Sequence, residues 1–443
     1  MKTPICDFVD KYLENDNIRL HMPGHKGVGS NMEAYDITEI SGADSLYEAN
    51  GIIAESEAIA SDLFGADTFY SAEGSSLSIR AMLYLVSIYA KEHKKRPKIL
   101  AGRNVHKSFI SGAALLDIDV DWLLSRDESY LCCKITADEI AEHLKKSEEL
   151  PTALYLTSPD YLGNTVDIKS ISRVCRERGV LLIVDNAHGA YLNFLENSIH
   201  PIALGADMCC DSAHKTLPAI TGAAYLHISR SAPQMLKSKA KSAMALFGST
   251  SPSYLILESL DRLNPYLACK YKDELGSLID SLEGLFSELR AHGFELIGDE
   301  PIKLTIAPKS YGYSGTEIAR ILESNGINPE FADPDFTVLM FSPHNTDNDI
   351  EALRRTLLSL PRKEPILSLP PKLSLPERVM SPREAVLSSS ETVPVKEALN
   401  RTLATVTVGC PPAVPIVVSG EKISESALCA FEYYGIQTCT VVK

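Results

Sequence analysis

The chain has 443 residues, of which 45% are apolar and 23% are charged, a composition typical of a globular protein with a large core. Its net charge of −15 argues against nucleic acid as a partner, because such binding needs a basic surface. Apolar runs fall short of the ~18 residues that span a membrane, and no apolar core follows Lys2 as it would in a signal peptide. We therefore expect a cytoplasmic protein with no membrane partner.

The N-terminal residues 1–50 are predicted to form an arm and an ordered loop. The stretch from His21 to Gly27 combines two histidines, a proline and two glycines, which disfavours a regular element. The loop either reaches toward a functional site or forms a subunit interface, and the sequence leaves both open.

A Gly-Ser-Ser turn is the candidate anion site. A helix is predicted over 51–64 and a short strand over 67–71, and Gly74-Ser75-Ser76 then opens a further helix. Small residues at a helix start leave backbone N–H groups free to bind a phosphate. An ordinary serine N-cap is the alternative.

Strand and helix patterns alternate along the next part of the chain. This alternation predicts an α/β fold with a mostly parallel sheet between helices. The strands are expected at 98–101, 120–124, 153–157, 180–184, 208–212 and 222–227. The predicted domain boundaries are 1–50 for the arm and loop, 51–268 for a large domain, 269–360 for a smaller α/β domain, 361–390 for a proline-rich extended connector and 391–443 for a C-terminal domain.

A lysine and an aspartate carry the strongest chemical signal. The apolar run 180–184 ends at Asp185, which places a carboxylate at the C-terminal end of a buried strand. Lys215 follows in Ser212-Ala213-His214-Lys215-Thr216. Pyridoxal phosphate (PLP) needs a lysine for a Schiff base and an acidic partner for its ring nitrogen, so this pair predicts a PLP site.

The ten cysteines have no Cys-x-x-Cys spacing, so the sequence contains no zinc ribbon or thioredoxin-type motif. Two pairs, Cys132-Cys133 and Cys209-Cys210, are adjacent, and the others are scattered. We expect reduced, mostly buried thiols and no bound metal.

Three motifs together resemble the Orn/Lys/Arg decarboxylases of the aspartate-aminotransferase-like PLP fold, particularly their short bacterial members. These motifs are His21–Gly27 followed by Asp36-Ile37-Thr38-Glu39, Ser212–Leu217, and Pro411-Pro412-Ala413-Val414-Pro415 ending in Gly420-Glu421. The resemblance implies fold type I, with a large PLP-binding domain around a seven-stranded, mostly parallel sheet, a smaller α/β domain and a family-specific C-terminal domain. It also implies that the flavodoxin-like domain of longer members is missing, because the opening motif begins at His21.

The resemblance implies a role for each site residue. Lys215 would bind the cofactor covalently, and Asp185 would pair with the pyridine nitrogen. His106 and Ala187 would pack on the two faces of the cofactor ring. His188 would lie near the ring's O3′ or the substrate carboxylate, and Lys215 or His214 would reprotonate the substrate carbon. The phosphate would be held by Gly74, Ser75, Ser76, Ser212 and His214.

The chain departs from the family pattern at several positions. Glu73 would repel a phosphate unless it is turned away. Asn186 replaces the usual acidic residue after Asp185, and Cys410 and Ala413 replace an aromatic residue and a glycine. These changes bear on substrate choice and activity more than on cofactor binding.

The predicted function is PLP-dependent decarboxylation of arginine, lysine or ornithine to the corresponding polyamine-pathway amine. The alternatives are another reaction on this fold, such as that of an aminotransferase or lyase, and a catalytically weak PLP-binding regulatory homologue. We expect a homodimer or a higher homo-oligomer, with Gly248-Ser249-Thr250 touching the partner's phosphate. The sequence does not choose among the three amino acids, because it does not identify the acidic wall of the distal pocket.

Overall fold

The structure is a computed structural model that describes residues 1–15, 17–124, 130–372, 375–406 and 412–443. The chain divides into two compact units, residues 1–95 with 175–275 and residues 96–174 with 276–443. Cys410 and Pro411 of the C-terminal motif lie outside the described residues. Within the described ranges, no helix combines the length and the apolar character needed to cross a membrane.

The central element is a seven-stranded sheet of mostly parallel strands, which confirms the predicted fold class. The strand order is β1 (Ala66–Ser71), β7 (Ala224–Ser229), β6 (Met208–Asp211), β5 (Leu181–Asp185), β4 (Ala153–Thr157), β2 (Lys98–Gly102) and β3 (Asp119–Leu123). Strand β7 runs antiparallel to both β1 and β6, whereas β5 with β6, β2 with β3 and β2 with β4 are parallel pairs.

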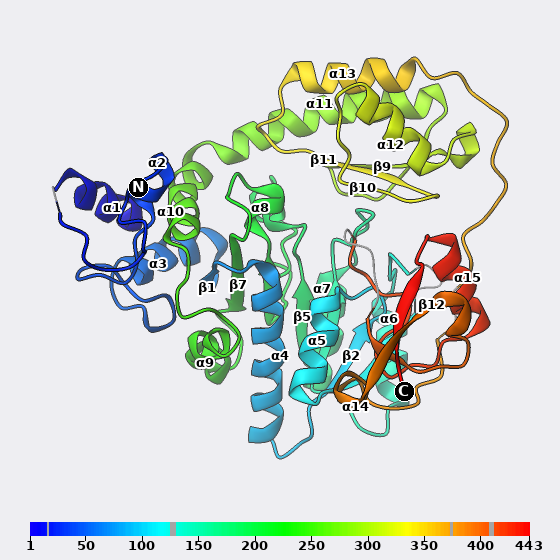
Figure 1. Cartoon of the computed structure of the whole chain (residues 1–443), viewed down its shortest axis with the longest axis horizontal. Coiled ribbons are helices and arrows are strands. Elements are labelled where there is room, and N and C mark those ends of the chain that lie inside the picture. Colours follow the sequence, from blue (N-terminus) through cyan, green and yellow to red (C-terminus); the bar gives the residue numbers. More distant parts are fainter. Residues whose placement is uncertain (16, 125–129, 373–374, 407–411) are drawn as a thin grey trace. The chain divides into compact units, whose positions relative to one another are not determined.

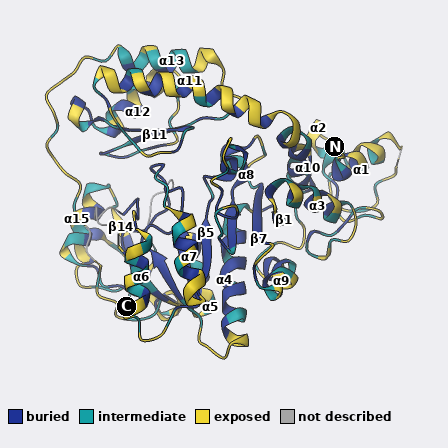
Figure 2. Cartoon of the chain, turned by 180° about the vertical axis from the view of Figure 1, so that it is seen from behind, coloured by how far each residue is buried: buried dark blue, intermediate teal, exposed yellow. Residues whose placement is uncertain are grey.

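The first unit contains β1, β7, β6 and β5. All five residues of β5 are buried, as expected of an apolar strand covered on both faces of a sheet. Figure 2 shows β5 and β7 in the dark blue of buried residues. The helices of this unit are α1 (Pro4–Glu14), α2 (Asn31–Tyr35), η1 (Leu46–Glu48), α3 (Ile52–Phe64), α4 (Gly74–Glu92), η2 (Ala190–Phe194), α8 (Ala213–Thr216), α9 (Gln234–Ala245) and α10 (Tyr254–Cys269).

The N-terminal helix α1 is anchored by a distant carboxylate. Its N-cap, Thr3, makes no side-chain capping bond. Instead, the Asp261 carboxylate accepts the backbone N–H groups of Ile5 and Cys6 at 2.9 and 3.0 Å, and it also accepts the Ser56 hydroxyl. These bonds satisfy N–H groups that the first helical turn leaves free.

The second unit contains β4, β2 and β3 together with two smaller sheets. One has the order β10 (Phe331–Ala332), β11 (Thr337–Met340), β9 (Lys303–Ala307), β8 (Glu295–Ile297), and Figure 1 shows α11, α12 and α13 on one side of it. The other has the order β12 (Ser390–Pro394), β14 (Thr438–Val442), β13 (Leu403–Thr405). The remaining elements are α5 (Lys107–Leu116), α6 (Ala137–Lys146), η3 (Pro308–Tyr311), α12 (Gly315–Ser324), α13 (Asp347–Leu358), α14 (Pro382–Leu387), η4 (Val395–Glu397) and α15 (Glu425–Tyr433). Two of the three unit boundaries fall inside helices, namely α7 (Ile168–Arg178) and α11 (Tyr271–His292).

The proline-rich stretch differs from its prediction as a purely extended segment, because it contains the short helix α14. Ser381 accepts the N–H of Glu384, and the Glu384 carboxylate accepts the N–H of Ser381. This is a capping box, and Pro382 stands at the first helical position where proline is favoured. The prediction from proline content was therefore wrong for this part of the stretch, where the spacing of Ser381 and Glu384 specifies a helix start.

The C-terminal sheet is built on a shared apolar core within the second unit. Val414, Val417 and Phe431 pack in one cluster with Leu162 and Val338.

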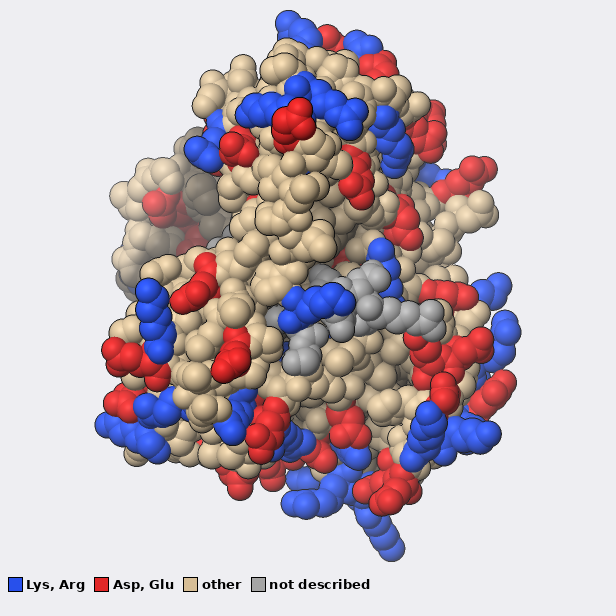
Figure 3. Space-filling view, turned by 90° about the vertical axis from the view of Figure 1, so that its right-hand side faces the viewer, with Lys and Arg blue, Asp and Glu red and all other residues tan. Residues whose placement is uncertain are grey.

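On the molecular face seen in Figure 3, acidic and basic side chains are interspersed and do not gather by sign.

Candidate functional site

Lys215 lies on the short helix α8, directly after strand β6. Its Nζ is 2.9 Å from Nε2 of His188, so the structure brings together two of the three predicted catalytic residues. His188 is 5% exposed, whereas Lys215 is half-buried. An amine and an imidazole at this distance can share or exchange one proton.

Asp185 ends strand β5 and is 2% exposed. The parallel register pairs Asp185 with Cys210, whose thiol lies 3.5 Å from the Asp185 Oδ1 and donates to it. Burial raises the pKa of the Cys210 thiol well above its usual value, so this group stays a neutral donor. The N–H of Ala187 donates to the same Oδ1 at 3.2 Å, which orients the carboxylate within its own turn.

The two motif turns are joined to each other by the backbone. The N–H of Ser212 donates to the carbonyl of Ala187 at 3.3 Å, and the N–H of Asn186 donates to the carbonyl of Cys210 at 3.0 Å. Because β5 and β6 are parallel neighbours, both turns leave the same edge of the sheet. The predicted cofactor residues of these turns are therefore adjacent.

The Gly-Ser-Ser turn meets the lysine motif through a hydroxyl pair. The Ser212 hydroxyl donates to Oγ of Ser75 at 2.8 Å, at the N-terminus of α4. Gly74 has φ +68°, a conformation that favours glycine, and no other group lies within 4 Å of the place a Cβ would take. The turn thus presents two hydroxyls and a helix N-terminus in one place.

Glu73 is the residue whose charge counts against a phosphate at this turn. Its carboxylate accepts the backbone N–H of Ser249. It also makes no capping bond to α4, although it occupies the N-cap position. The carboxylate is therefore held by a different segment from the helix N-terminus.

His214 is held by the backbone on the other side of the lysine. Its Nδ1 lies 2.9 Å from the carbonyl oxygen of Ala223, and its N–H donates to the same oxygen at 3.3 Å. A carbonyl oxygen only accepts, so Nδ1 carries a proton and a neutral His214 has its lone pair on Nε2.

His106 belongs to the second unit, where it is the N-cap of α5. Its Nδ1 accepts the N–H of Ser108 at 3.2 Å. Its predicted position on the cofactor's face stays a prediction, as do the roles of Ser76 and the other site residues.

The loop that carries His106 is held by the C-terminal motif, a relation that sequence reasoning missed. Arg103 is buried, and its Nη2 donates to the Glu421 carboxylate at 2.8 Å and to the carbonyl of Ile416 at 3.1 Å. The N–H of Lys107 donates to the carbonyl of Ala413 at 2.9 Å. The buried partners on both sides of His106 therefore come from residues more than 300 positions later.

Gly420 of this motif cannot carry a side chain. Its φ is +90°, and a Cβ there would lie 2.3 Å from the carbonyl oxygen of Met380. The signal in the sequence was the Gly420-Glu421 pair itself, which indicated a motif but no partner.

Comparison with known proteins gives consistent matches over nearly the whole chain. The model of the Orn/Lys/Arg decarboxylase major domain matches residues 3–276, and that of the family's C-terminal domain matches residues 371–438. An arginine decarboxylase of Halalkalibacterium halodurans is 28% identical, with 96% of this chain and 92% of the relative covered. The uncharacterized protein YaaO of Bacillus subtilis is 30% identical, with 97% and 93% covered.

Solved structures share the fold. The constitutive lysine decarboxylase of E. coli superimposes with a TM-score of 0.79 at 19% identity. The superposition covers 100% of this chain and 82% of the lysine decarboxylase chain. The motifs at Lys215 and Glu421, their partners in the structure and the two family matches lead to one conclusion: the chain belongs to the Orn/Lys/Arg decarboxylase family.

Proposed function

We propose that the protein decarboxylates arginine to agmatine, with PLP bound at Lys215. Family membership implies PLP as the cofactor and decarboxylation of a basic amino acid as the reaction. The observation that carries the proposal is the pair formed by Lys215 Nζ and His188 Nε2 at 2.9 Å, on a turn joined to that of Asp185.

The residues present fit the cofactor. A lysine amine, a buried carboxylate at a strand end and a helix N-terminus with two hydroxyls are the three groups that PLP requires. Lys215 would hold the aldehyde carbon, Asp185 the ring nitrogen, and Ser75 with Ser212 the phosphate. The Glu73 carboxylate accepts the N–H of Ser249 and makes no capping bond to α4, so it does not occupy the N–H groups at the helix start that would bind the phosphate.

Each side chain then has a task in the reaction. Bound PLP supplies an electron sink for the breaking bond between Cα and the carboxylate. Asp185 keeps the ring nitrogen protonated, which favours that electron flow. His188 accepts a proton from Lys215 Nζ, which leaves the amine nucleophilic, and the same pair returns a proton to Cα once carbon dioxide has left.

The choice of arginine rests on the curated relatives. Arginine decarboxylases of H. halodurans and B. subtilis are each 28% identical with 92% of their length covered. The lysine decarboxylase LdcA of Pseudomonas aeruginosa is 21% identical with 74% of its length covered. We further propose a cytoplasmic homodimer or higher homo-oligomer whose product enters polyamine formation, and light scattering of the purified protein measures its assembly.

The test is an absorbance spectrum of the purified protein with added PLP, followed by carbon dioxide release from arginine, lysine and ornithine in parallel. We expect a bound-cofactor band and fastest release from arginine. Lys215→Ala should lose both the band and the release, whereas Lys239→Ala, an exposed lysine on α9, should keep both. Release from lysine or ornithine alone would contradict the choice of substrate, and a band with no release from any of the three would contradict the proposed reaction.

A further inference from the structure

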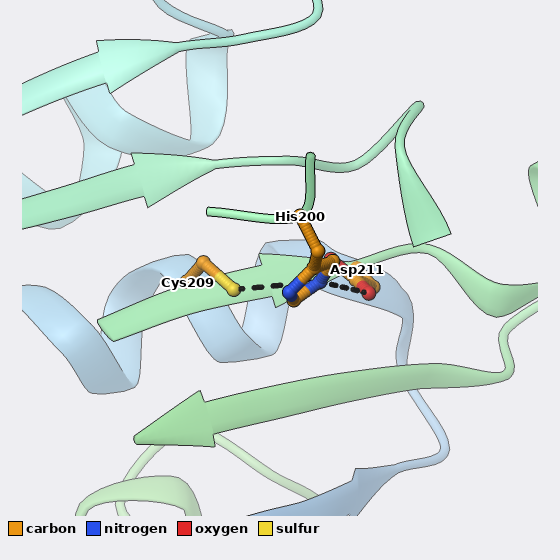
Figure 4. A group of neighbouring side chains, drawn as sticks. All are labelled: His200, Cys209 and Asp211. Carbon is orange, nitrogen blue, oxygen red and sulfur yellow. Dashed lines mark hydrogen bonds and ion pairs between the residues drawn. The ribbon is translucent and has the colours of Figure 1, made fainter. Parts of the chain in front are cut away.

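A fully buried polar cluster in the first unit includes Asp211, the residue that immediately precedes the lysine motif. Asp211, the residue before Ser212, is surrounded by His200, Cys209 and His227, and all four are 0% exposed. Figure 4 shows His200 between the Cys209 sulfur and the Asp211 carboxylate. A carboxylate with no access to water persists only when it is well hydrogen-bonded.

Both oxygens of Asp211 are used. Oδ2 lies 3.0 Å from Nε2 of His200 and 3.2 Å from Nε2 of His227. Oδ1 accepts the side-chain amide of Asn186 at 2.6 Å. The second nitrogen of His227 lies 2.9 Å from the hydroxyl of Thr68, so this ring is bonded at both ends.

Three of these residues, His200, Cys209 and Asp211, also form a candidate ligand set for a metal ion. Cys209 Sγ lies 3.9 Å from Nε2 of His200, and a nitrogen, a sulfur and an oxygen make a ligand set that zinc accepts. Without a metal the Cys209 group is a neutral thiol, because burial raises its pKa well above the usual value. Nε2 of His200 and Nε2 of His227 both contact Oδ2 of Asp211, so a metal at this place would have to displace two hydrogen bonds.

The link from this cluster to the site runs through Asn186. Its amide is held by Asp211, and its backbone carbonyl accepts the N–H of Gly189 at 2.7 Å. A Cβ on Gly189 would lie 2.1 Å from the Asn186 Oδ1, so the amide fills the space beside that glycine. Asn186 therefore spans the turn from Asp185 to Gly189, which includes His188.

We propose that Asp211 is a positioning residue, which holds Asn186 and so fixes the turn that presents Asp185 and His188. The inference rests on the proposed PLP site, because it concerns how two of that site's residues are aimed. It also explains why residue 186 is an amide. A carboxylate there would face the Asp211 carboxylate in a dry interior, where like charges repel most strongly.

The test exchanges the two groups. Asn186→Asp places two carboxylates face to face. In Asp211→Asn, the new side-chain amide N–H must face another donor. That donor is either the N–H groups of His200 and His227 or the side-chain N–H of Asn186. The double variant Asn186→Asp/Asp211→Asn restores one acceptor for each donor, because the amide of residue 211 can donate to residue 186 and accept from both histidines. Asp207→Asn is the matched control, since Asp207 accepts the N–H of Leu182 at the opposite end of β5.

The readouts are kcat for the preferred substrate, the pH profile of the cofactor absorbance band and the thermal unfolding temperature. We expect each single variant to lower kcat about tenfold to a hundredfold and to shift the pH profile of the band, and the double variant to recover most of both. Asp207→Asn should leave the pH profile unchanged even where it lowers the unfolding temperature.

Several outcomes would overturn the proposal while leaving the proposed function intact. Single variants with the wild-type pH profile and kcat would show that Asp211 positions nothing. A double variant no better than the single ones would indicate a purely structural role. Stoichiometric zinc that copurifies with the wild type and is lost in Asp211→Asn would replace hydrogen bonding with metal binding. A wild-type protein without a cofactor band would instead count against the proposed function.

Discussion

Each unit of the molecule contains a buried carboxylate at one of the sequence motifs: Asp211 immediately precedes the lysine motif, and Glu421 ends the C-terminal motif. The pKa values of these two carboxylates are shifted in opposite directions. Asp211 is 0% exposed in the first unit and Glu421 is 2% exposed in the second. Burial opposes the charge of both, yet His200 and His227 hold the pKa of Asp211 below its usual value, whereas burial outweighs Arg103 and raises the pKa of Glu421.

The difference lies in how many donors reach each carboxylate. Asp211 receives donors on both oxygens, from two imidazoles and one amide. Glu421 receives the Arg103 guanidinium and the N–H of Val418, both on Oε2. A buried charge is favoured only when its partners together replace the lost water, and the two donors of Glu421 reach only one of its oxygens, whereas the three donors of Asp211 reach both.

The largest expected effect comes from removing one side of the buried ion pair. Arg103→Leu leaves the Glu421 carboxylate buried and unpaired, which should cost about 3–5 kcal/mol in the free energy of unfolding. Urea denaturation measures the loss. Arg230→Leu is the control, because its bond to Asp62 joins exposed side chains and should contribute about 1 kcal/mol or less. A loss no larger than that of the control would contradict the comparison.

The next prediction uses pH to separate the two carboxylates. The raised pKa of Glu421 means that its contribution to stability is present below its usual value of 4.5 and is lost as pH rises through the folded-state value. The lowered pKa of Asp211 means that its contribution is present above 3.8 and is lost as pH falls. His227 acts in the same direction as Asp211, because burial lowers its pKa from 6.5.

Unfolding temperatures measured across pH should therefore respond to the two variants with opposite slopes. Glu421→Gln should reduce the loss of stability as pH rises above 4.5, and Asp211→Asn should reduce the loss as pH falls below 3.8. Each variant serves as the control for the other. Equal changes in both directions would mean that the number of donors does not set the behaviour of these groups.

The smallest expected effect concerns the outer edge of the Asp211 cluster. Thr68→Val removes the hydroxyl that lies 2.9 Å from Nδ1 of His227 and keeps the shape of the side chain. We expect a loss of about 1 kcal/mol by urea denaturation, the usual contribution of one buried hydrogen bond. A loss of unfolding free energy larger than that of Arg103→Leu would mean that Thr68, and not Asp211, contributes most to the stability of the cluster.

Much of the fold was accessible to sequence reasoning because its signals are local. The apolar run 180–184 predicted the buried strand β5, and alternating patterns predicted the α/β class. The opposite direction of β7 was not predictable, since a strand's own residues do not state which way its neighbours run. The helix α14 carried a readable capping box at Ser381 and Glu384, but the surrounding prolines obscured it.

For the site, the chemical groups were readable from the sequence, because Lys215, Asp185 and the histidines stand in short motifs of residue types that a PLP site needs. The partners of these groups became known from the folded structure alone. Ser75 meets Ser212 across 137 positions, and Arg103 meets Glu421 across 318. The physical reason is that periodicity and motif spacing report on neighbours along the chain, whereas a buried charge is satisfied by whichever segments the folded core places beside it.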